Sequence, residues 1–247
     1  MLSLWIQTVS SLAMIIIILL VQVLIYPQFK HVNSNDLSTY SKFHIKHISW
    51  VVIPFMLAEF FSLIVLWTNK GAWSFWLISA TGLLVLIWAL TFLKIVPLHN
   101  QICQRADSEL LPKLIQLNAV RTLLWVLKSV SIFCLFIVFI TPNLQYQAIF
   151  NADLDSTLSK SNGYKLIYEG GLSSTDLDDV LSTLDAQLVV QEGSLKKYIV
   201  RTAYLKFPDL LIIDHKKERT IFWSKSLLGY FDFDKNKDRL KWIQKKI

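Results

Sequence analysis

The chain has 247 residues, of which 53% are hydrophobic and only 17% are charged. Together with a mean hydropathy of +0.45, this composition excludes an ordinary soluble globular protein and predicts an integral membrane protein. The formal charge of +7 does not indicate nucleic-acid binding, because much of the excess lies in short loops beside apolar stretches. We therefore expect the lipid bilayer, and no nucleic acid, as a partner.

Four apolar stretches in the first half are long enough to cross a bilayer, which takes about 20 residues of helix. The expected spans are residues 4–26, 48–67, 76–96 and 114–141. The first span lacks the basic start, the short apolar run and the small-residue cleavage site of a signal peptide, so we expect it to remain in the protein. Residues 1–141 are thus predicted to form a four-helix transmembrane bundle.

The basic residues of the short loops predict the orientation of this bundle. Six Lys and Arg residues lie in the loops at 27–47 and 97–121, whereas the opposite side offers only Lys70 near a helix. Lys and Arg concentrate on the cytoplasmic side of a membrane. We therefore expect a multi-pass protein of the bacterial inner (cell) membrane, with both termini and the C-terminal half on the periplasmic or extracytoplasmic side.

After a linker expected at residues 142–163, the pattern changes to that of a small soluble domain at 164–247. Apolar residues at helical spacing predict a helix from Thr175 to Ala186, and Leu240, Ile243 and Ile247 share one face of a final helix. Runs rich in β-branched and aromatic residues predict strands. These runs are 187–194, 196–207 and 209–226, the last divided by a polar turn at 216–218. We expect an α+β domain, an antiparallel sheet with helices packed on one side.

Eight polar or turn residues stand in a fixed order within "FPDLLIID" and "SKSLLGYFDFDKNKDRLKWI". They are Asp209, Ser224, Ser226, Gly229, Tyr230, Asp232, Asn236 and Arg239. With this order the region from Tyr164 to Ile243 resembles the domain of unknown function 1499 family of bacterial envelopes and plastids. The resemblance implies a fold and a compartment more than a reaction.

Two interpretations of this motif remain. In one, its Ser, Asp, Asn and Arg side chains form a ligand site at the end of the sheet. In the other, which we favour, Gly229 supplies a permissive backbone angle, Asp232 or Asp234 caps the last helix and Arg239 pairs with an acid.

Glu59 lies near the middle of the second span, where an ionised carboxylate is costly and usually faces the bundle interior beside a partner. Lys128 on the fourth span has a flexible stem that could reach it. We predict that Glu59 is held by Lys128, or is neutral and hydrogen-bonded. In the alternative, Lys128 extends back to the membrane interface and Glu59 is protonated beside a Thr or Ser.

A second polar group gathers near the cytoplasmic face. It comprises His44, His47, His99, Asn100, Asn118 and Arg121. The histidines could hold a metal, and Arg121 and Asn118 with the histidines could equally bind an anion or a polar lipid headgroup. No cofactor is identified by any of these residues.

The stretches "VPLHNQ" and "LNAVRTLLW" also resemble the four-helix membrane family that includes anthrone-oxygenase-like proteins, domain of unknown function 1772. The matching residues are Pro97, Leu98, Asn100, Asn118, Arg121 and Thr122. This resemblance implies a quinone-like or polyketide-like aromatic substrate and oxygen chemistry.

Two functions follow from these patterns. The favoured one is a non-enzymatic envelope accessory or assembly protein that binds a small ligand, or a protein partner through its exported domain. The alternative is a membrane oxidoreductase or oxygenase-like bundle with Glu59 as proton carrier. The sequence leaves open whether the chain is an enzyme and whether it forms oligomers.

Overall fold

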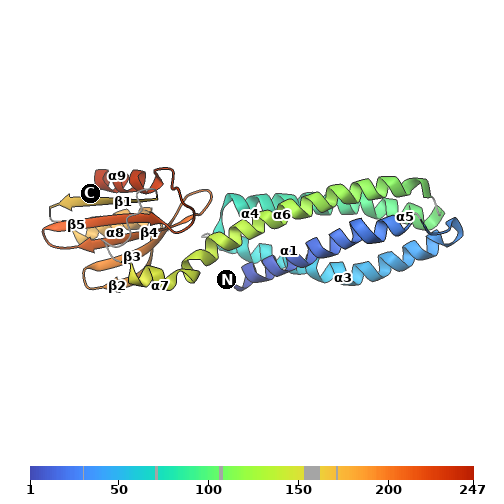
Figure 1. The fold of residues 1–247 in the computed structure, drawn as a ribbon, viewed down its shortest axis with the longest axis horizontal. Coiled ribbons are helices and arrows are strands. Elements are labelled where there is room, and N and C mark those ends of the chain that lie inside the picture. The colour runs from blue at the N-terminus through green and yellow to red at the C-terminus, as the bar shows by residue number, and fades with distance from the viewer. Residues whose placement is uncertain (30, 70–71, 106–107, 153–161, 171) are drawn as a thin grey trace. The chain divides into compact units, whose positions relative to one another are not determined.

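The computed structural model describes residues 1–29, 31–69, 72–105, 108–152, 162–170 and 172–247. Lys30 and Lys70, two of the loop charges that predict the orientation, lie outside these residues, as does much of the expected linker. The chain forms two compact units. The bundle unit is Met1–Phe136 and the sheet unit is Ile137–Ile247, and Figure 1 shows the long helices of the first and the strands of the second.

The described residues include four helices that are long and apolar enough to cross a membrane, which confirms the multi-pass prediction. They are Leu2–Phe29, Asp36–Thr68, Phe75–Gln104 and Leu111–Leu144. Within them the structure distinguishes α1 (Leu2–Leu20), η1 (Val21–Ile25), α2 (Tyr26–Phe29), α3 (Ser34–Thr68), α4 (Phe75–Leu90), η3 (Thr91–Ile95), α5 (Val96–Arg105), the short turn η4 (Ser108–Leu110) and α6 (Leu111–Leu144).

The helices begin earlier than the apolar stretches alone suggest. The second helix starts at Ser34 rather than at residue 48, because no Pro or Gly interrupts the polar segment that leads into the span. A buried cluster that includes Tyr26, Phe29, Leu37 and Ile102 packs these outer turns together. These buried contacts stabilise helical turns that lie beyond the apolar stretches, so the helices are longer than a bilayer requires.

The end of α6 carries a proline whose missing N–H is compensated by another element. Pro142 lies inside the helix and cannot donate to the carbonyl oxygen four residues earlier, that of Val138. Instead, Arg201 Nη1 donates to the Val138 carbonyl oxygen at 2.9 Å, and the Arg201 guanidinium lies 4.4 Å from the centre of the Phe139 ring. All these residues belong to the sheet unit, so the last turns of α6 are part of that unit.

The sheet unit contains five antiparallel strands in the order β1-β5-β4-β3-β2, which confirms the predicted α+β class. Its elements after α6 are α7 (Tyr146–Asn151), β1 (Gly163–Glu169), α8 (Ser174–Thr183), β2 (Gln187–Glu192), β3 (Leu195–Arg201), β4 (Pro208–His215), β5 (Arg219–Ser226) and α9 (Lys235–Lys246). The predicted runs became β2 to β5. Strand β1, which pairs with β5 at the sheet edge, was not predicted.

Helices cover both faces of this sheet, so the expectation of helices on one side is wrong. Phe222 and Leu211 pack with α8 and α9 on one face, whereas Ile212 and Trp223 pack with Ile149 of α7 on the other. Strand β4 explains this arrangement, because all but the last of its residues are buried. A strand that is apolar on both sides requires cover on both faces, and part of the expected linker provides it as helix.

Replacing Phe222 tests the α8 and α9 face. Phe222 is fully buried, and Phe222→Ala should lower the free energy of unfolding of the sheet unit by about 3–5 kcal/mol through lost contacts and a cavity. The control is Ile167→Ala on β1, whose side chain is 46% exposed. Pulse proteolysis of the full chain in urea and mild detergent measures both, and equal losses would contradict the packing described.

A polar cluster fixes the β2–β3 turn to the end of β4. Ser194 Oγ donates to Asp214 Oδ1 at 2.6 Å, and Lys216 Nζ lies 3.0 Å from Asp214 Oδ2. Burial raises the pKa of Asp214, but the Ser194 hydroxyl, Lys216 and Arg219 outweigh burial and bring the pKa below its ordinary value of 3.8. Because the folded pKa lies below the unfolded one, the ionised carboxylate stabilises the fold above about pH 4, and this stability is lost as the pH falls through the folded pKa.

Asp214→Asn should therefore destabilise the sheet unit at neutral pH. The difference in unfolding free energy between wild type and variant should shrink as the pH falls from about 4 through the lower pKa of the folded carboxyl, below which the wild-type side chain is protonated as well. Urea unfolding at a series of pH values measures this, with Glu192→Gln, at an exposed position on β2, as the control. A difference that does not change with pH would contradict the assignment.

Candidate functional site

Glu59 of α3 and Lys128 of α6 form a buried ion pair within the bundle unit. Lys128 Nζ lies 2.6 Å from Glu59 Oε1, and both side chains are fully buried. Ser11 of α1 completes a triangle, because its Oγ donates to Glu59 Oε1 at 2.8 Å and accepts from Lys128 Nζ at 2.9 Å. This is the arrangement expected from the depths of the two charges, and Lys128 does not extend back to the interface.

Further groups complete the surroundings of Lys128. In the orientation that satisfies both ends of its amide, Gln7 accepts from Lys128 Nζ at 3.2 Å and donates to the Glu59 carbonyl oxygen at 2.8 Å. The Lys128 ammonium also lies 4.9 Å from the centre of the Trp125 ring. Glu59 Oε2 has no hydrogen-bond partner among the described residues. The cluster joins α1, α3 and α6, which is first of all a structural role.

Removing one member of this pair should leave a buried charge without compensation. Lys128→Met should lower the stability of the bundle by about 3–5 kcal/mol, and the double variant Glu59→Gln with Lys128→Met should recover most of the loss. Titration with SDS in mixed micelles measures both. A single variant as stable as wild type would contradict the pairing.

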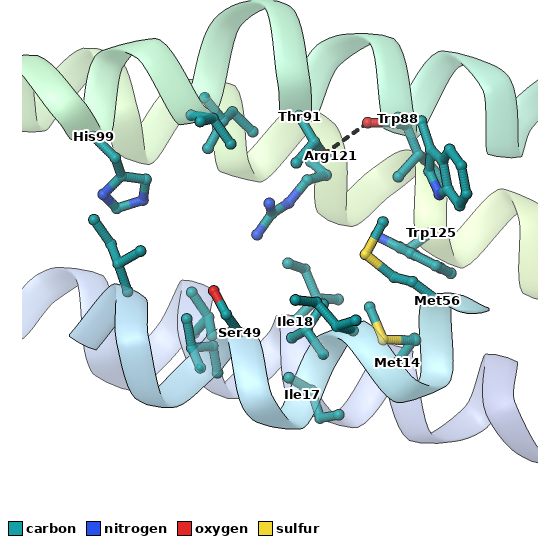
Figure 2. A pocket seen from close by; sticks show the side chains of 18 of the residues that line it. Met14, Ile17, Ile18, Ser49, Met56, Trp88, Thr91, His99, Arg121 and Trp125 are labelled. Atoms are coloured by element: carbon teal, nitrogen blue, oxygen red, sulfur yellow. Dashed lines mark hydrogen bonds between the residues drawn. The ribbon is translucent and has the colours of Figure 1, made fainter. Parts of the chain in front are cut away.

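Beside this cluster the bundle encloses a cavity of about 470 Å³, bounded by α1, α3, the helix that runs from α4 through η3 to α5, and α6. Most of its walls are aliphatic or aromatic. In Figure 2, Arg121 projects from α6 into the space between His99 at one end and Met14, Met56 and Trp88 at the other. The cavity is therefore apolar along most of its length and carries a cation in its middle.

The π-helical segments of the described chain border this cavity. Val21 begins η1 (Val21–Ile25), and Thr91, Phe92 and Ile95 belong to η3 (Thr91–Ile95); all four residues line the cavity. A π-helical turn widens a helix by departing from the usual hydrogen-bond spacing, and such turns are frequent at functional sites. The two spans are therefore distorted at the level of the cavity.

Hydrogen-bonding groups without partners gather on the cavity lining. Arg121 makes no hydrogen bond or ion pair with any residue that the structure describes, and its Nε is buried. Two other lining atoms, His99 Nδ1 and Trp88 Nε1, are likewise buried and unpartnered within the described chain. Unsatisfied polar groups at bilayer depth are expensive. The cavity lining therefore carries hydrogen-bonding groups that no described residue engages.

Tyr26 and two histidines shape the polar end of the cavity. The Tyr26 hydroxyl and His99 Nε2 share a hydrogen bond of 2.9 Å. The His44 ring lies 6.3 Å from the His99 ring and 6.0 Å from the Tyr26 ring, measured between ring centres. Tyr26, His44 and His99 therefore lie together beside Arg121 on the cavity wall.

The other residues predicted for this site lie elsewhere. Asn118 is fully buried and donates from Nδ2 to Gln22 Oε1 at 2.7 Å, so it ties α6 to η1, whereas Asn100 is exposed. His47 is exposed as well, and its Nδ1 donates to the Phe43 carbonyl oxygen at 2.7 Å. His44, one turn earlier on the same helix, lines the cavity, whereas His47 does not.

The predicted metal site is corrected by this geometry. His44 and His99 lie on the cavity wall, but His47 does not converge with them. In the described parts of the chain, no group of three or more His, Cys, Asp or Glu side chains could hold a metal ion.

The motif of the sheet unit forms a second, largely buried polar network. Arg239 Nη2 lies 2.5 Å from Asp209 Oδ2, and Ser226 Oγ donates to Asp209 Oδ1 at 2.6 Å. Arg239 Nη1 also donates to Ser224 Oγ at 3.1 Å and to Asn236 Oδ1 at 2.9 Å. These groups use one another as partners, so the network attaches α9 to β4 and β5.

The remaining motif residues shape the turn before α9. Gly229 has a φ of +93°, and Asp232 Oδ2 accepts from the backbone N of Asn236 at 3.1 Å. Tyr230 is 71% exposed and lies outside the network. The motif thus has the geometry of the structural interpretation, in which Asp232 rather than Asp234 caps the helix.

Comparison with known proteins gives no relative: no family model, no curated protein and no solved structure matches this chain. The two family resemblances therefore stay predictions. Sequence spacing identified Arg121, Lys128, Glu59 and His99, but it missed Tyr26 and Trp88 on the cavity wall. It also missed the polar stripe of α1, although Gln7 and Ser11, four residues apart inside an apolar span, were a visible signal.

Proposed function

We propose that this integral membrane protein is an envelope accessory protein that takes a small amphipathic ligand from the bilayer and holds it in the bundle cavity. The ligand carries an acidic or strongly accepting head that Arg121 binds, and an apolar body that the aliphatic and aromatic walls enclose. The observation that carries the proposal is the guanidinium of Arg121, which has no partner among the described residues and projects into the cavity.

The size and chemistry of the cavity support a ligand of this kind. Pockets that hold small molecules typically measure about 300–1,000 Å³ and combine apolar walls with a few convergent polar groups. Arg presents a planar fork of donors that suits carboxylate and phosphate groups. Glu59 does not neutralise Arg121, since it is engaged by Lys128. An acidic ligand head therefore complements the positive charge of Arg121, which Glu59 does not neutralise.

The flanks of the cavity favour access from the lipid. Ile53 and Leu57 of α3 and Phe92 and Val96 on the facing helix line the cavity and are also 40–56% exposed. Residues that both line a cavity and reach the surface mark its opening, here between two membrane helices. An apolar molecule dissolved in the bilayer would reach Arg121 without passing through water.

The orientation predicted from the loop charges indicates which membrane leaflet the polar end of the cavity faces. With Lys and Arg of the short loops in the cytoplasm, the Tyr26, His44 and His99 end lies toward the cytoplasmic leaflet of a cell membrane, and the sheet unit lies on the periplasmic or extracytoplasmic side. The protein would then bind its ligand in the membrane and carry a folded domain outside.

One observation favours a second candidate function at the same site. The Tyr26 hydroxyl and His99 form a hydrogen-bonded pair beside the cavity, and such a pair can pass a proton to a carbonyl oxygen. A quinone-like ring would accept hydrogen bonds from Arg121 and Tyr26. In this case the bundle would be an oxidoreductase in which Tyr26 and His99 supply protons to the quinone and a separate redox partner supplies the electrons.

The test is to identify what the full chain retains after purification in mild detergent. Mass spectrometry of the extracted molecules should find an acidic amphiphile enriched over bulk lipid. Arg121→Met should lower its occupancy about tenfold or more, because a charge-assisted hydrogen bond contributes about 1.5–3 kcal/mol. Lys94→Met removes a charge from an exposed position of η3 outside the cavity lining and should retain the ligand.

The outcomes separate the candidates. A quinone absorption band that is lost in Arg121→Met would favour the oxidoreductase. Equal occupancy in wild type and Arg121→Met, or no enriched small molecule in either, would contradict ligand binding at Arg121.

A further inference from the structure

The sheet unit exposes four aromatic side chains on two loops. Tyr204, on the loop between β3 and β4, is 82% exposed, and the loop between β5 and α9 exposes Tyr230, Phe231 and Phe233 at 71%, 65% and 87%. We call these two segments the aromatic loops. Large apolar side chains that are exposed together mark an interaction surface more often than isolated ones do.

Both aromatic loops lie at one end of the sheet. The first follows the end of β3 at Arg201, and the second follows the end of β5 at Ser226. The strands are antiparallel, and the Leu227 backbone N donates to the carbonyl oxygen of Pro208, where β4 begins. The four aromatic rings therefore belong to one end of the sheet unit, and the turn between β4 and β5 lies at the other.

The same end of the sheet is bound to the last turns of a membrane-spanning helix. Arg201, three residues before Tyr204, donates to the Val138 carbonyl oxygen. Leu227, three residues before Tyr230, accepts from Gln145 Nε2 at 3.0 Å. Val138 lies inside the candidate span Leu111–Leu144. The first aromatic loop thus starts at a contact with the last turns of α6, and the second at a contact with Gln145, the residue that follows α6.

The second aromatic loop holds a defined conformation with its rings outward. Asp232 accepts from the backbone N of Asp234 at 3.2 Å and from Asn236 Nδ2 at 2.8 Å. Phe233 has a φ of +51°, a left-handed conformation that is unfavourable for a bulky residue unless the surroundings enforce it. The exposure of Phe233 is therefore a built feature of the turn.

We propose that the aromatic loops insert into the headgroup region of the bilayer that α6 crosses, and that the sheet unit is a membrane-surface domain. Aromatic rings are favoured at the boundary between hydrocarbon and water, where Tyr also keeps its hydroxyl hydrated. Arg201 at the start of the first loop contacts α6, and Leu227 at the start of the second contacts Gln145, which follows α6; both contacts favour the bilayer over a soluble partner as the surface that these loops meet. This proposal is independent of ligand binding in the bundle.

The experiment measures the depth of a spin label on the full chain in nanodiscs of phosphatidylcholine and phosphatidylglycerol. Cys103 and Cys134 are first replaced by Ala, and single labels are attached through Phe233→Cys, Tyr204→Cys and Lys217→Cys. Lys217 is exposed in the turn between β4 and β5, at the opposite end of the sheet, and serves as the control. Accessibility to oxygen, which concentrates in lipid, is compared with accessibility to a water-soluble nickel chelate.

The labels at positions 233 and 204 should show a ratio of oxygen to nickel accessibility several-fold above that at 217. The added changes Tyr230→Ser and Phe231→Ser affect only exposed side chains and should reduce the ratio at 233 toward the control. Three results would overturn the proposal. These are equal ratios at 233 and 217, a label at 233 shielded from both reagents as in a protein contact, or dipolar broadening that reveals a second copy at the loops.

Discussion

The constraint on which the bundle depends is the cost of an unpaired charge inside a bilayer. Glu59 and Lys128 avoid this cost by pairing with each other, and Ser11 and Gln7 accept the other hydrogen bonds of the Lys128 ammonium. Arg121, seven residues before Lys128 on α6, lacks such a partner in the described chain and borders a cavity. The same helix therefore carries Lys128, whose charge is paired inside the bundle, and Arg121, whose charge is not paired by any described residue.

The sheet unit obeys a related constraint. Strand β4 is buried on both sides, so neither face of the sheet can be left to water. The chain supplies α8 and α9 for one face and α7 for the other. The network around Asp209 and Arg239 then fixes α9 by saturating its own donors and acceptors. A saturated network is a poor binding site, which separates it from the unsatisfied groups of the bundle cavity.

Much of this architecture could be predicted from the sequence because its signals are local. Apolar length identified the four spans, and the depths of Glu59 and Lys128 suggested their pairing. The features that were missed depend on tertiary contacts. The π-helical segments at Val21 and Thr91 have no characteristic composition. The six residues of α7 do not reveal that they cover a sheet, so the sequence predicts a linker there. The exposure of His47 is not predictable from its spacing to His44, because helical spacing gives a relative angle and not which side of the helix faces the bundle interior.

The contact between Arg201 and the Val138 carbonyl oxygen has a consequence for biogenesis. Pro142 leaves that oxygen without a helical donor, and the residue that replaces the donor is synthesised 63 positions later. The end of the last span therefore has a backbone carbonyl without a helical donor until β3 has folded and brought Arg201 to it. The last turns of α6 and the fold of the sheet unit therefore depend on each other through this contact, and truncation after α6 would remove the donor to the Val138 carbonyl oxygen.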